Sequence, residues 1–223
     1  MPGSAMYLDR MVNVEGYDAG KSPFMLTTVY LFKGSYFFQL IQPFSNFIVI
    51  RPEESVLLEG ETKQEYDERQ KLSMKESKQN AINAALLHLT LPPEQAEVAG
   101  SLVNFNSMNI SGPSAGLVLS LEIVRQFSLE QDLSKGYKIA GTGTIDKEGA
   151  VGRVGSVRLK VKTALKKDAE IFFVPNDANK PNSNFIEAQQ VNQELGNKLQ
   201  VVPVSTLAEA LEFLEALPTK FTQ

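Results

Sequence analysis

Hydrophobic positions alternate with polar ones in some segments and recur every three to four residues in others. This pattern predicts a mixture of strands and helices. Strands are predicted over residues 24–32, 46–50, 101–110, 137–145, 171–174 and 199–204. Helices are predicted over residues 73–89, 114–127, 157–167 and 207–217. Because the order lacks a strict βαβ rhythm, the predicted fold class is α+β, or mixed α/β.

The segments between these elements are polar or rich in turn-forming residues. Acidic residues crowd positions 53–70, which indicates a solvated helix or loop. Pro92 and Pro93 end the helix predicted over 73–89, so residues 90–100 are expected to form a short link.

Composition narrows the possible functions. The chain has 223 residues, of which 43% are hydrophobic, enough for one domain or two small ones. It has no Cys and a single His, His88, so thiol chemistry and a multi-histidine metal site are excluded, and no cofactor is expected. The net charge of −4, without a basic run, argues against nucleic-acid binding.

The most apolar stretch, residues 34–50, is interrupted by Pro43 and several polar residues, so it is not expected to span a membrane. The first residues also lack the features of a signal peptide. As given, the chain is expected to be soluble.

Candidate chemistry begins at residues 109–116, which run Asn-Ile-Ser-Gly-Pro-Ser-Ala-Gly between a predicted strand and a predicted helix. Unpaired N–H groups and the helix dipole at a helix start would stabilise the oxyanion of an acyl-transfer reaction. The small residues Gly112, Ala115 and Gly116 would admit a substrate backbone. The alternative is that Ser111 or Ser114 only caps the helix.

A serine nucleophile needs a base that removes its proton. His88 lies next to apolar residues near the end of a predicted helix, without an acidic residue to orient it. Lys160 follows a glycine-rich turn on an apolar helix, where burial would lower its pKa toward neutrality. An ordinary lysine that extends to water is the alternative. Lys162 would point to a different helix face, and Lys138 precedes the glycine-bearing strand.

Three ordered motifs together resemble the proteolytic domain of Lon proteases. They are Gly-Pro-Ser-Ala-Gly at 112–116, Ala-Gly-Thr-Gly-Thr-Ile at 140–145 and Gly-x-Val-Gly-x-Val-Gly-x-x-x-x-Lys at 149–160. Three motifs in order are more specific than any one alone. The resemblance implies the Lon proteolytic domain fold, with two helices packed on mixed sheets and an extra N-terminal segment.

The resemblance also implies roles for individual residues. The family's Ser–Lys dyad corresponds to Ser114 as nucleophile and Lys160 as general base, and its lysine-orienting threonine corresponds to Thr142. The implied oxyanion and substrate loop consists of Gly112, Pro113 and Ala115. The implied activity is that of a serine endopeptidase that acts on unstructured polypeptide segments. The implied assembly is a homo-oligomer, for which the family offers a hexameric ring. No Gly-x-x-x-x-Gly-Lys-Ser/Thr motif is present, so no nucleotide is expected and cleavage would be ATP-independent.

Within the family, segments 22–29, 65–70 and 139–146 are similar to bacterial membrane-anchored Lon-like proteases of the YlbL type. Members of that group have a membrane anchor, a protease domain outside the cell membrane and a PDZ domain inserted before the serine. Residues 90–100 are too short for a PDZ domain, so we expect a form from which the anchor and the PDZ domain are removed. The implied organisation is an N-terminal segment at 1–72 and a proteolytic domain at 73–223, with its catalytic part at 101–217.

Two alternative functions remain open. A glycine- and serine-rich turn before a helix can bind phosphate, as in some small-molecule kinases, although residues 112–117 match such a loop poorly and Lys160 would then have no role. A catalytically silent scaffold of the same fold that binds peptides or assembles with partners is the other alternative, because the presence of both dyad residues does not ensure that they meet.

Overall fold

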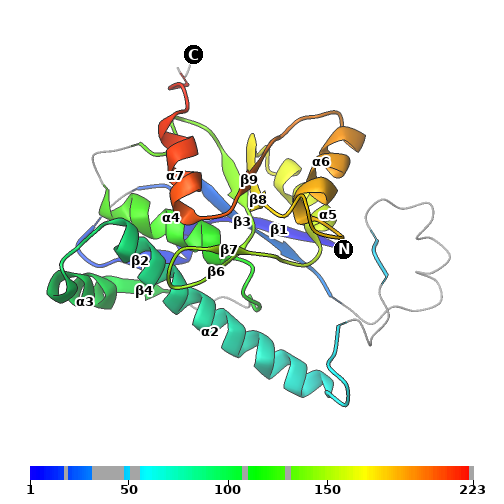
Figure 1. The fold of residues 1–223 in the computed structure, drawn as a ribbon, viewed down its shortest axis with the longest axis horizontal. Helices are drawn as coiled ribbons and strands as arrows, with labels where there is room; N and C mark the ends of the chain where they lie inside the picture. The colour runs from blue at the N-terminus through cyan, green and yellow to red at the C-terminus, as the bar shows by residue number, and fades with distance from the viewer. Residues whose placement is uncertain (18–19, 32–47, 51–55, 107–109, 129–131, 221–223) are drawn as a thin grey trace.

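The computed structural model describes all residues except 18–19, 32–47, 51–55, 107–109, 129–131 and 221–223 (Figure 1). The strands are β1 (Pro2–Tyr7), β2 (Val12–Val14), β3 (Phe24–Val29), β4 (Val103–Phe105), β5 (Ile139–Gly141), β6 (Thr144–Ile145), β7 (Val151–Gly152), β8 (Ile171–Pro175) and β9 (Gln200–Val204). The helices are α2 (Lys63–His88), α3 (Pro93–Leu102), α4 (Gly116–Phe127), α5 (Val157–Leu165), α6 (Asn184–Glu194), α7 (Leu207–Glu215) and the short 3-10 helix η1 (Leu8–Arg10). The α+β class is therefore confirmed.

A five-stranded sheet in the order β1-β3-β5-β8-β9 forms the centre of the molecule. Strands β3, β5, β8 and β9 are parallel, and β1 pairs with β3 in the antiparallel direction. Two small antiparallel pairs, β2-β4 and β6-β7, lie outside this sheet. Parallel pairing needs crossover connections, and α5 and α6 supply them between β5, β8 and β9.

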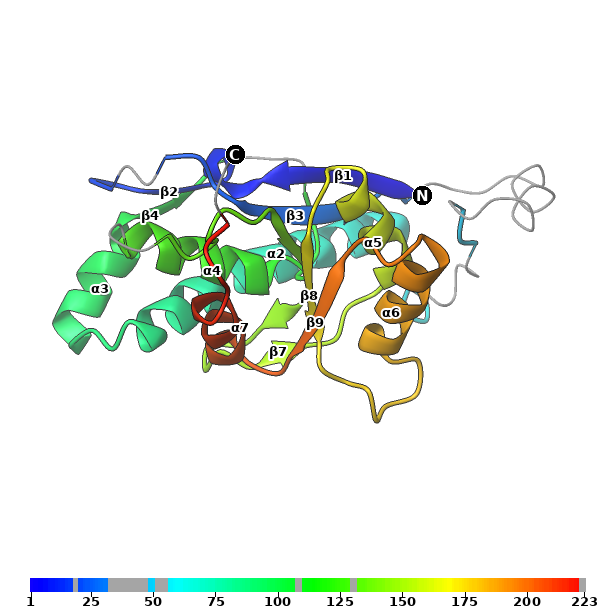
Figure 2. The ribbon, with the colours of Figure 1, turned by 90° about the horizontal axis from the view of Figure 1, so that it is seen from above.

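Each face of the central sheet carries its own hydrophobic core, because successive side chains of a strand point to opposite faces. In β8, Ile171 and Phe173 belong to the core shared with α2, α4 and α7, which we call the α4-side core. Phe172 and Val174 belong to the core shared with α5 and α6, which we call the α5-side core. Figure 2 shows α4 and α7 on one side of β8 and β9, and α5 and α6 on the other. Ser114, which directly precedes α4, and Lys160, which lies on α5, therefore belong to segments on opposite faces of the sheet.

Strands β1 and β3 belong to the central sheet, and β3 lies next to β5, on which one of the Lon-like motifs begins. Residues 2–29 thus share a sheet and two cores with the rest of the molecule. Helix α2 runs continuously through residue 72, where the N-terminal segment was expected to end.

Helix α2 begins ten residues before the position expected from the sequence. A capping box starts it, in which Thr62 Oγ1 accepts a hydrogen bond from the Glu65 backbone N–H and the Glu65 carboxylate accepts one from the Thr62 N–H. Arg69 also pairs with Glu61 at 2.6 Å. The first turns of α2 are polar and mostly exposed, so apolar periodicity could not reveal them.

Other elements also differ from the expected ones. The polar link expected at 90–100 contains helix α3, which Pro93 begins, because the first turn of a helix tolerates a residue without an N–H. Of the strand expected at 46–50, residues 48–50 form no strand, and 46–47 lie outside the described residues. Strands β1 and β2 and helix α6 were not predicted; they are short or have a weak apolar pattern.

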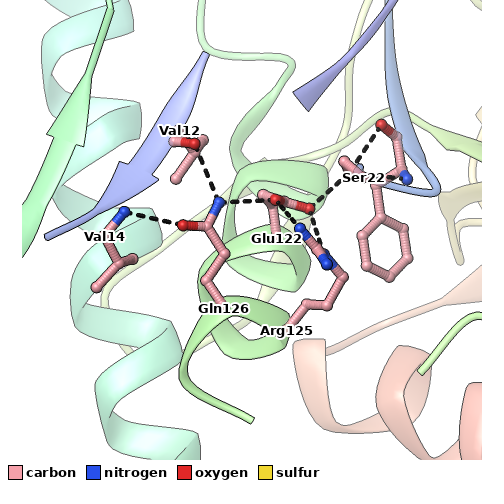
Figure 3. A network of polar contacts seen from close by, with 7 residues as sticks. Val12, Val14, Ser22, Glu122, Arg125 and Gln126 are labelled. Atoms are coloured by element: carbon pink, nitrogen blue, oxygen red, sulfur yellow. Dashed lines mark hydrogen bonds and ion pairs between the residues drawn. The ribbon is translucent and has the colours of Figure 1, made fainter. Parts of the chain in front are cut away.

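A buried polar cluster fixes α4 in the α4-side core (Figure 3). The fully buried Glu122 carboxylate accepts hydrogen bonds from Ser22 Oγ at 2.6 Å, Gln126 Nε2 at 2.7 Å and the Arg125 guanidinium at 2.8 and 3.0 Å. Gln126 also donates to the Val12 carbonyl and accepts from the Val14 N–H. The cluster therefore ties β2 and the segment before β3 to the helix that follows Ser114.

In the part of the chain that the structure describes, no helix is long and apolar enough to cross a membrane.

Candidate active site

Ser114 lies in a tight turn immediately before α4, and the turn is held from outside by α2. Ser77 Oγ donates to the Pro113 carbonyl at 3.0 Å, and the Gly112 N–H donates to the Gln70 carbonyl at 3.0 Å. Gly112 has a φ of +91°, a region that favours glycine, and an added Cβ would lie 2.8 Å from Gln70 Oε1. These contacts fix the turn independently of the serine side chain.

The first residue of α4 is equally constrained. An added Cβ at Gly116 would lie 2.7 Å from Ile145 Cγ2 and 2.9 Å from the Ile145 backbone nitrogen. Glycine is therefore required there by close approach of α4 to β6, which brings the Ser114 turn against the residues that follow β5.

Thr142 links the serine turn to Lys160. The Thr142 hydroxyl donates to the Ser114 carbonyl at 3.1 Å and accepts a hydrogen bond from Lys160 Nζ at 2.9 Å. The Gly143 N–H donates to the same Ser114 carbonyl at 3.0 Å. The structure therefore brings Ser114, Thr142 and Lys160, three residues singled out in the sequence, to one place between the two helix layers.

Lys160 is a buried basic residue whose Nζ makes one hydrogen bond to the described residues. Its side chain lies on the first part of α5 and the residue is 4% exposed. Burial lowers the pKa of its ammonium from the ordinary 10.5 to about 7, against a weaker opposing effect of the Glu187 charge. A lysine with such a pKa is substantially neutral at neutral pH and is able to accept a proton.

The N–H groups near Ser114 differ in availability. Gly112 uses its N–H toward Gln70, and Pro113 has none, so neither can donate to a ligand. Among the described residues, no hydrogen bond uses the backbone N–H of Ser114 or Ala115. These two groups precede the first turn of α4, where the helix dipole also favours a negative charge.

The segment that leads into α5 is fixed by Asp177. This carboxylate accepts hydrogen bonds from the Ser183 hydroxyl and from the Asn184 and Phe185 N–H groups, and it pairs with Arg153 Nε at 2.7 Å. Asn184 in turn bonds both backbone groups of Val154. The approach to the helix that carries Lys160 is thus held against the start of α6.

The other basic residues considered in the sequence lie elsewhere. His88 is exposed at the end of α2, and Lys138 is exposed before β5. Lys162 is buried, but the charges that act on its pKa are those of Arg158 and Glu194, so it lies on another side of α5 than Lys160. Ser111 is exposed and precedes the turn.

No capping hydrogen bond from a side chain is found at the start of α4, whose N-cap residue is Ala115. The alternative in which Ser111 or Ser114 merely caps this helix therefore has no support in the geometry. Among the described residues there is also no group of three or more His, Asp or Glu side chains that could hold a metal ion.

One further sequence, Gly20-Lys21-Ser22, superficially resembles the end of a phosphate-binding loop. Ser22 Oγ donates to the Glu122 carboxylate, and the segment leads into a strand rather than a helix. A carboxylate at this position would repel phosphate, so this segment is not a nucleotide cradle.

Sequence reasoning assigned no role to several residues that shape the site. Ser77 and Gln70 hold the serine turn from α2, and Asp177 holds the approach to α5. Ser77 lies in the helix predicted over 73–89, but nothing in the sequence indicates that it contacts residue 113. Such contacts join positions tens of residues apart.

The comparison with known families identifies the family of this chain. Residues 53–217 match the model of the Lon protease (S16) C-terminal proteolytic domain. The chain therefore belongs to the Lon protease C-terminal proteolytic domain family, which is a class of serine proteases. The α+β fold is consistent with such a proteolytic domain.

Individual relatives are distant and much longer. The chain is 28% identical over 102 residues to a Lon protease of Neorickettsia sennetsu, covering 46% of this chain and 11% of that protein. It is 26% identical over 98 residues to a Lon protease of Aster yellows witches'-broom phytoplasma, covering 44% and 11%. A Lon protease of Campylobacter jejuni is 28% identical over 103 residues, covering 46% and 12%. The aligned part is about a tenth of each of these relatives.

Proposed function

We propose that this chain is an ATP-independent serine endopeptidase in which Ser114 is the nucleophile and Lys160 the general base. The observation that carries the proposal is the hydrogen-bonded path from Lys160 Nζ through the Thr142 hydroxyl to the Ser114 carbonyl. It brings a buried lysine with a pKa of about 7 to a serine at a helix start.

The reaction follows from these positions. Neutral Lys160 takes the proton of Ser114 Oγ as the oxygen attacks the peptide carbonyl, and the N–H groups of Ser114 and Ala115 bind the resulting oxyanion. The Lys160 ammonium then donates its proton to the leaving amine, which leaves an acyl ester on Ser114. A water molecule, deprotonated by Lys160, hydrolyses that ester and restores the free serine.

Thr142 acts as a positioning residue in this scheme. Its hydroxyl donates to the serine turn, so its lone pair is directed at Lys160 Nζ. No hydrogen bond joins Ser114 Oγ to Lys160 Nζ in this structure. Catalytic hydrogen bonds are often long or poorly aligned before substrate binds, and a bound peptide substrate would tighten the contact between Ser114 Oγ and Lys160 Nζ.

Substrate access supports an endopeptidase that takes extended polypeptide. A protease without an unfolding motor reaches only segments that are already unstructured, and this chain has no nucleotide-binding loop of the P-loop type. Ser114 is partly exposed at its turn, whereas its neighbours Gly112 and Ala115 are buried, so a polypeptide segment can approach the serine from the solvent side.

The test is mass spectrometry of casein, an unstructured protein, incubated without nucleotide with the parent chain, Ser114→Ala and Ser111→Ala. Ser111 is a matched control because it is exposed and three residues away. We expect new peptide termini with the parent and Ser111→Ala, and none with Ser114→Ala. Equal cleavage by Ser114→Ala would refute the assignment of the nucleophile.

A silent peptide-binding scaffold of the same fold is the second candidate. This hypothesis predicts that the parent and Ser114→Ala both bind casein and that neither of them cleaves it. The phosphate-binding alternative predicts nucleotide binding by calorimetry, and the turn at 112–116 would have to supply the N–H groups. Gly112 and Pro113 cannot, as described above.

We also propose that the chain self-associates, with a hexameric ring as the expected form. The family resemblance motivates this assembly. Sedimentation-velocity analysis across a concentration series measures it directly, and a monomer at every concentration would refute it without affecting the dyad.

A further inference from the structure

The search for a further role leads to Thr27, on the strand beside the proposed dyad. Its hydroxyl is the buried side-chain oxygen without a hydrogen-bond partner in the described part of the chain, and the residue is 4% exposed. A buried hydroxyl without a partner costs free energy, so its retention suggests a partner that appears in another state of the site.

The strand register places this hydroxyl beside Thr142. Strand β3 pairs with β5 in parallel, and the last residue pair of this register is Leu26 opposite Gly141, where β5 ends. We infer the position of Thr27 by continuing this register for one residue, which would place it opposite Thr142. On the other side, Thr27 is paired with Ala5 of β1, which belongs to the α5-side core. Met25 also belongs to that core, and side chains two residues apart share a face, so Thr27 faces α5.

Helix α5 contacts the sheet on both sides of Thr27. Lys160 donates to Thr142, the residue directly after β5, and Thr163, one turn further along the same helix face, contacts the Thr28 carbonyl on β3 at 3.4 Å. Thr27 lies between these two points, being the neighbour of Thr142 across the sheet and of Thr28 along the chain. Lys160 Nζ makes a single hydrogen bond to the described residues, to Thr142.

We propose that Thr27 is a second positioning residue for Lys160, whose hydroxyl accepts a hydrogen bond from the ammonium that forms when Lys160 takes the proton of Ser114. A neutral amine has two N–H groups and an ammonium has three. Protonation therefore adds an N–H donor to Lys160 Nζ. The Thr142 hydroxyl already accepts one hydrogen bond from Nζ, and the Thr27 hydroxyl would accept another. This inference rests on the proposed function for its catalytic meaning.

The surroundings of Lys160 contain few other groups that could take this role. Glu187 of α6 is the carboxylate whose charge acts on the pKa of Lys160. Tyr7 of β1 packs against the α5-side core. Strands β3 and β5 contain no ionisable residue. On α5 itself, Arg158 and Lys162 are the neighbouring cations, and they cannot accept a hydrogen bond.

The test compares Thr27→Val, which has nearly the same shape without a hydroxyl, with Thr27→Ser, which restores it. The matched control is Thr163→Val, because the Thr163 hydroxyl donates to the Leu159 carbonyl of its own helix at 2.9 Å. The readout is the pH titration of the Lys160 side chain by carbon-13 NMR of labelled lysine, assigned from the spectrum of Lys160→Arg. It does not depend on peptidase activity.

Loss of an acceptor for the ammonium disfavours the charged form. In Thr27→Val we therefore expect the titration midpoint of Lys160 about 1 pH unit lower than in the parent, with Thr27→Ser and Thr163→Val near the parent value. In peptide cleavage, the acidic limb of kcat/KM should move in the same direction and kcat should fall about tenfold. An unchanged midpoint in Thr27→Val, or a Thr27→Ser that behaves like it, overturns the inference. A parent that titrates as expected but cleaves nothing overturns the proposed function instead.

Discussion

Two ionisable side chains are buried on opposite faces of the central sheet, and their polar surroundings differ. Glu122 on α4 accepts hydrogen bonds from Ser22, Arg125 and Gln126 at 2.6 to 3.0 Å. Lys160 on α5 has one such bond to the described residues, to Thr142. The donors around the carboxylate replace much of the hydration that burial removes, whereas one hydroxyl replaces little of the water around an ammonium.

The difference teaches how burial can serve structure on one side and proton transfer on the other. Glu122, with its charge compensated, ties β2 and the segment before β3 to the helix that follows Ser114. Lys160, with little compensation, has a pKa lowered to about 7. A base with a pKa near the working pH is the most effective proton acceptor, so sparse solvation of Lys160 is what the proposed chemistry needs.

The largest expected effect is on activity, from Lys160→Met. Methionine fills a similar volume but cannot accept a proton, so we expect kcat/KM for a casein-derived peptide to fall by at least about 10³-fold. Circular dichroism should show an unchanged fold. Retention of more than a tenth of the parent rate would show that another group removes the Ser114 proton.

In contrast to Lys160→Met, the substitution Glu122→Ala is expected to act mainly on stability. Removing the carboxylate takes away the acceptor shared by Ser22, Arg125 and Gln126, and we expect the free energy of unfolding to fall by about 3–5 kcal/mol. Urea denaturation measures it. Glu122→Gln, which keeps the shape and loses the charge, should cost less. If Glu122→Ala unfolds at the urea concentration of the parent, the cluster does not stabilise the fold.

The pH dependence of stability tests whether the pKa of Lys160 is lowered by burial. Lys160 has a folded-state pKa of about 7 and an unfolded-state pKa near 10.5, so above pH 7 the unfolded state binds more protons and stability rises with pH from this group. Below pH 7 the full cost of burying the charge is present. The stability of Lys160→Met relative to the parent should therefore be about 4–5 kcal/mol greater at pH 6 than at pH 10, with the change occurring between pH 7 and 10. A pH-independent difference would contradict a lowered pKa of Lys160.

The smallest expected effect is a difference in stability between glycine substitutions at the starts of α4 and α5. Gly116→Ala places a methyl group against Ile145, and we expect a loss of about 1–3 kcal/mol in unfolding free energy together with reduced activity. Gly155→Ala, before α5, meets no atom within 4 Å and should change stability by less than about 0.5 kcal/mol. Thermal melts of both variants test the pair, and equal losses would mean that the approach of α4 to β6 is not close in solution.

Strong local patterns made much of the fold predictable. Helices α4, α5 and α7 and strands β8 and β9 were predicted within one to three residues, because their apolar periodicity is strong. The early start of α2 was missed, although Thr62 and Glu65 have the spacing of a capping box. Helix α6 was missed because its apolar pattern is weak and its start depends on Ser183 and Asp177.

By itself, the sequence determined the α+β class, the family and the residues that meet at the site: Ser114, Thr142 and Lys160. Motif order and spacing carry that information along the chain. The tertiary structure alone decided which N–H groups near Ser114 stay available, how deeply Lys160 is buried and that Thr27 faces the same helix. Those properties depend on residues such as Gln70, Ser77 and Gly141, which lie far away in the chain and act only when the sheet and its two layers are assembled. A pKa and a hydrogen bond are set by everything within a few ångströms, and sequence neighbours are a small part of that surrounding.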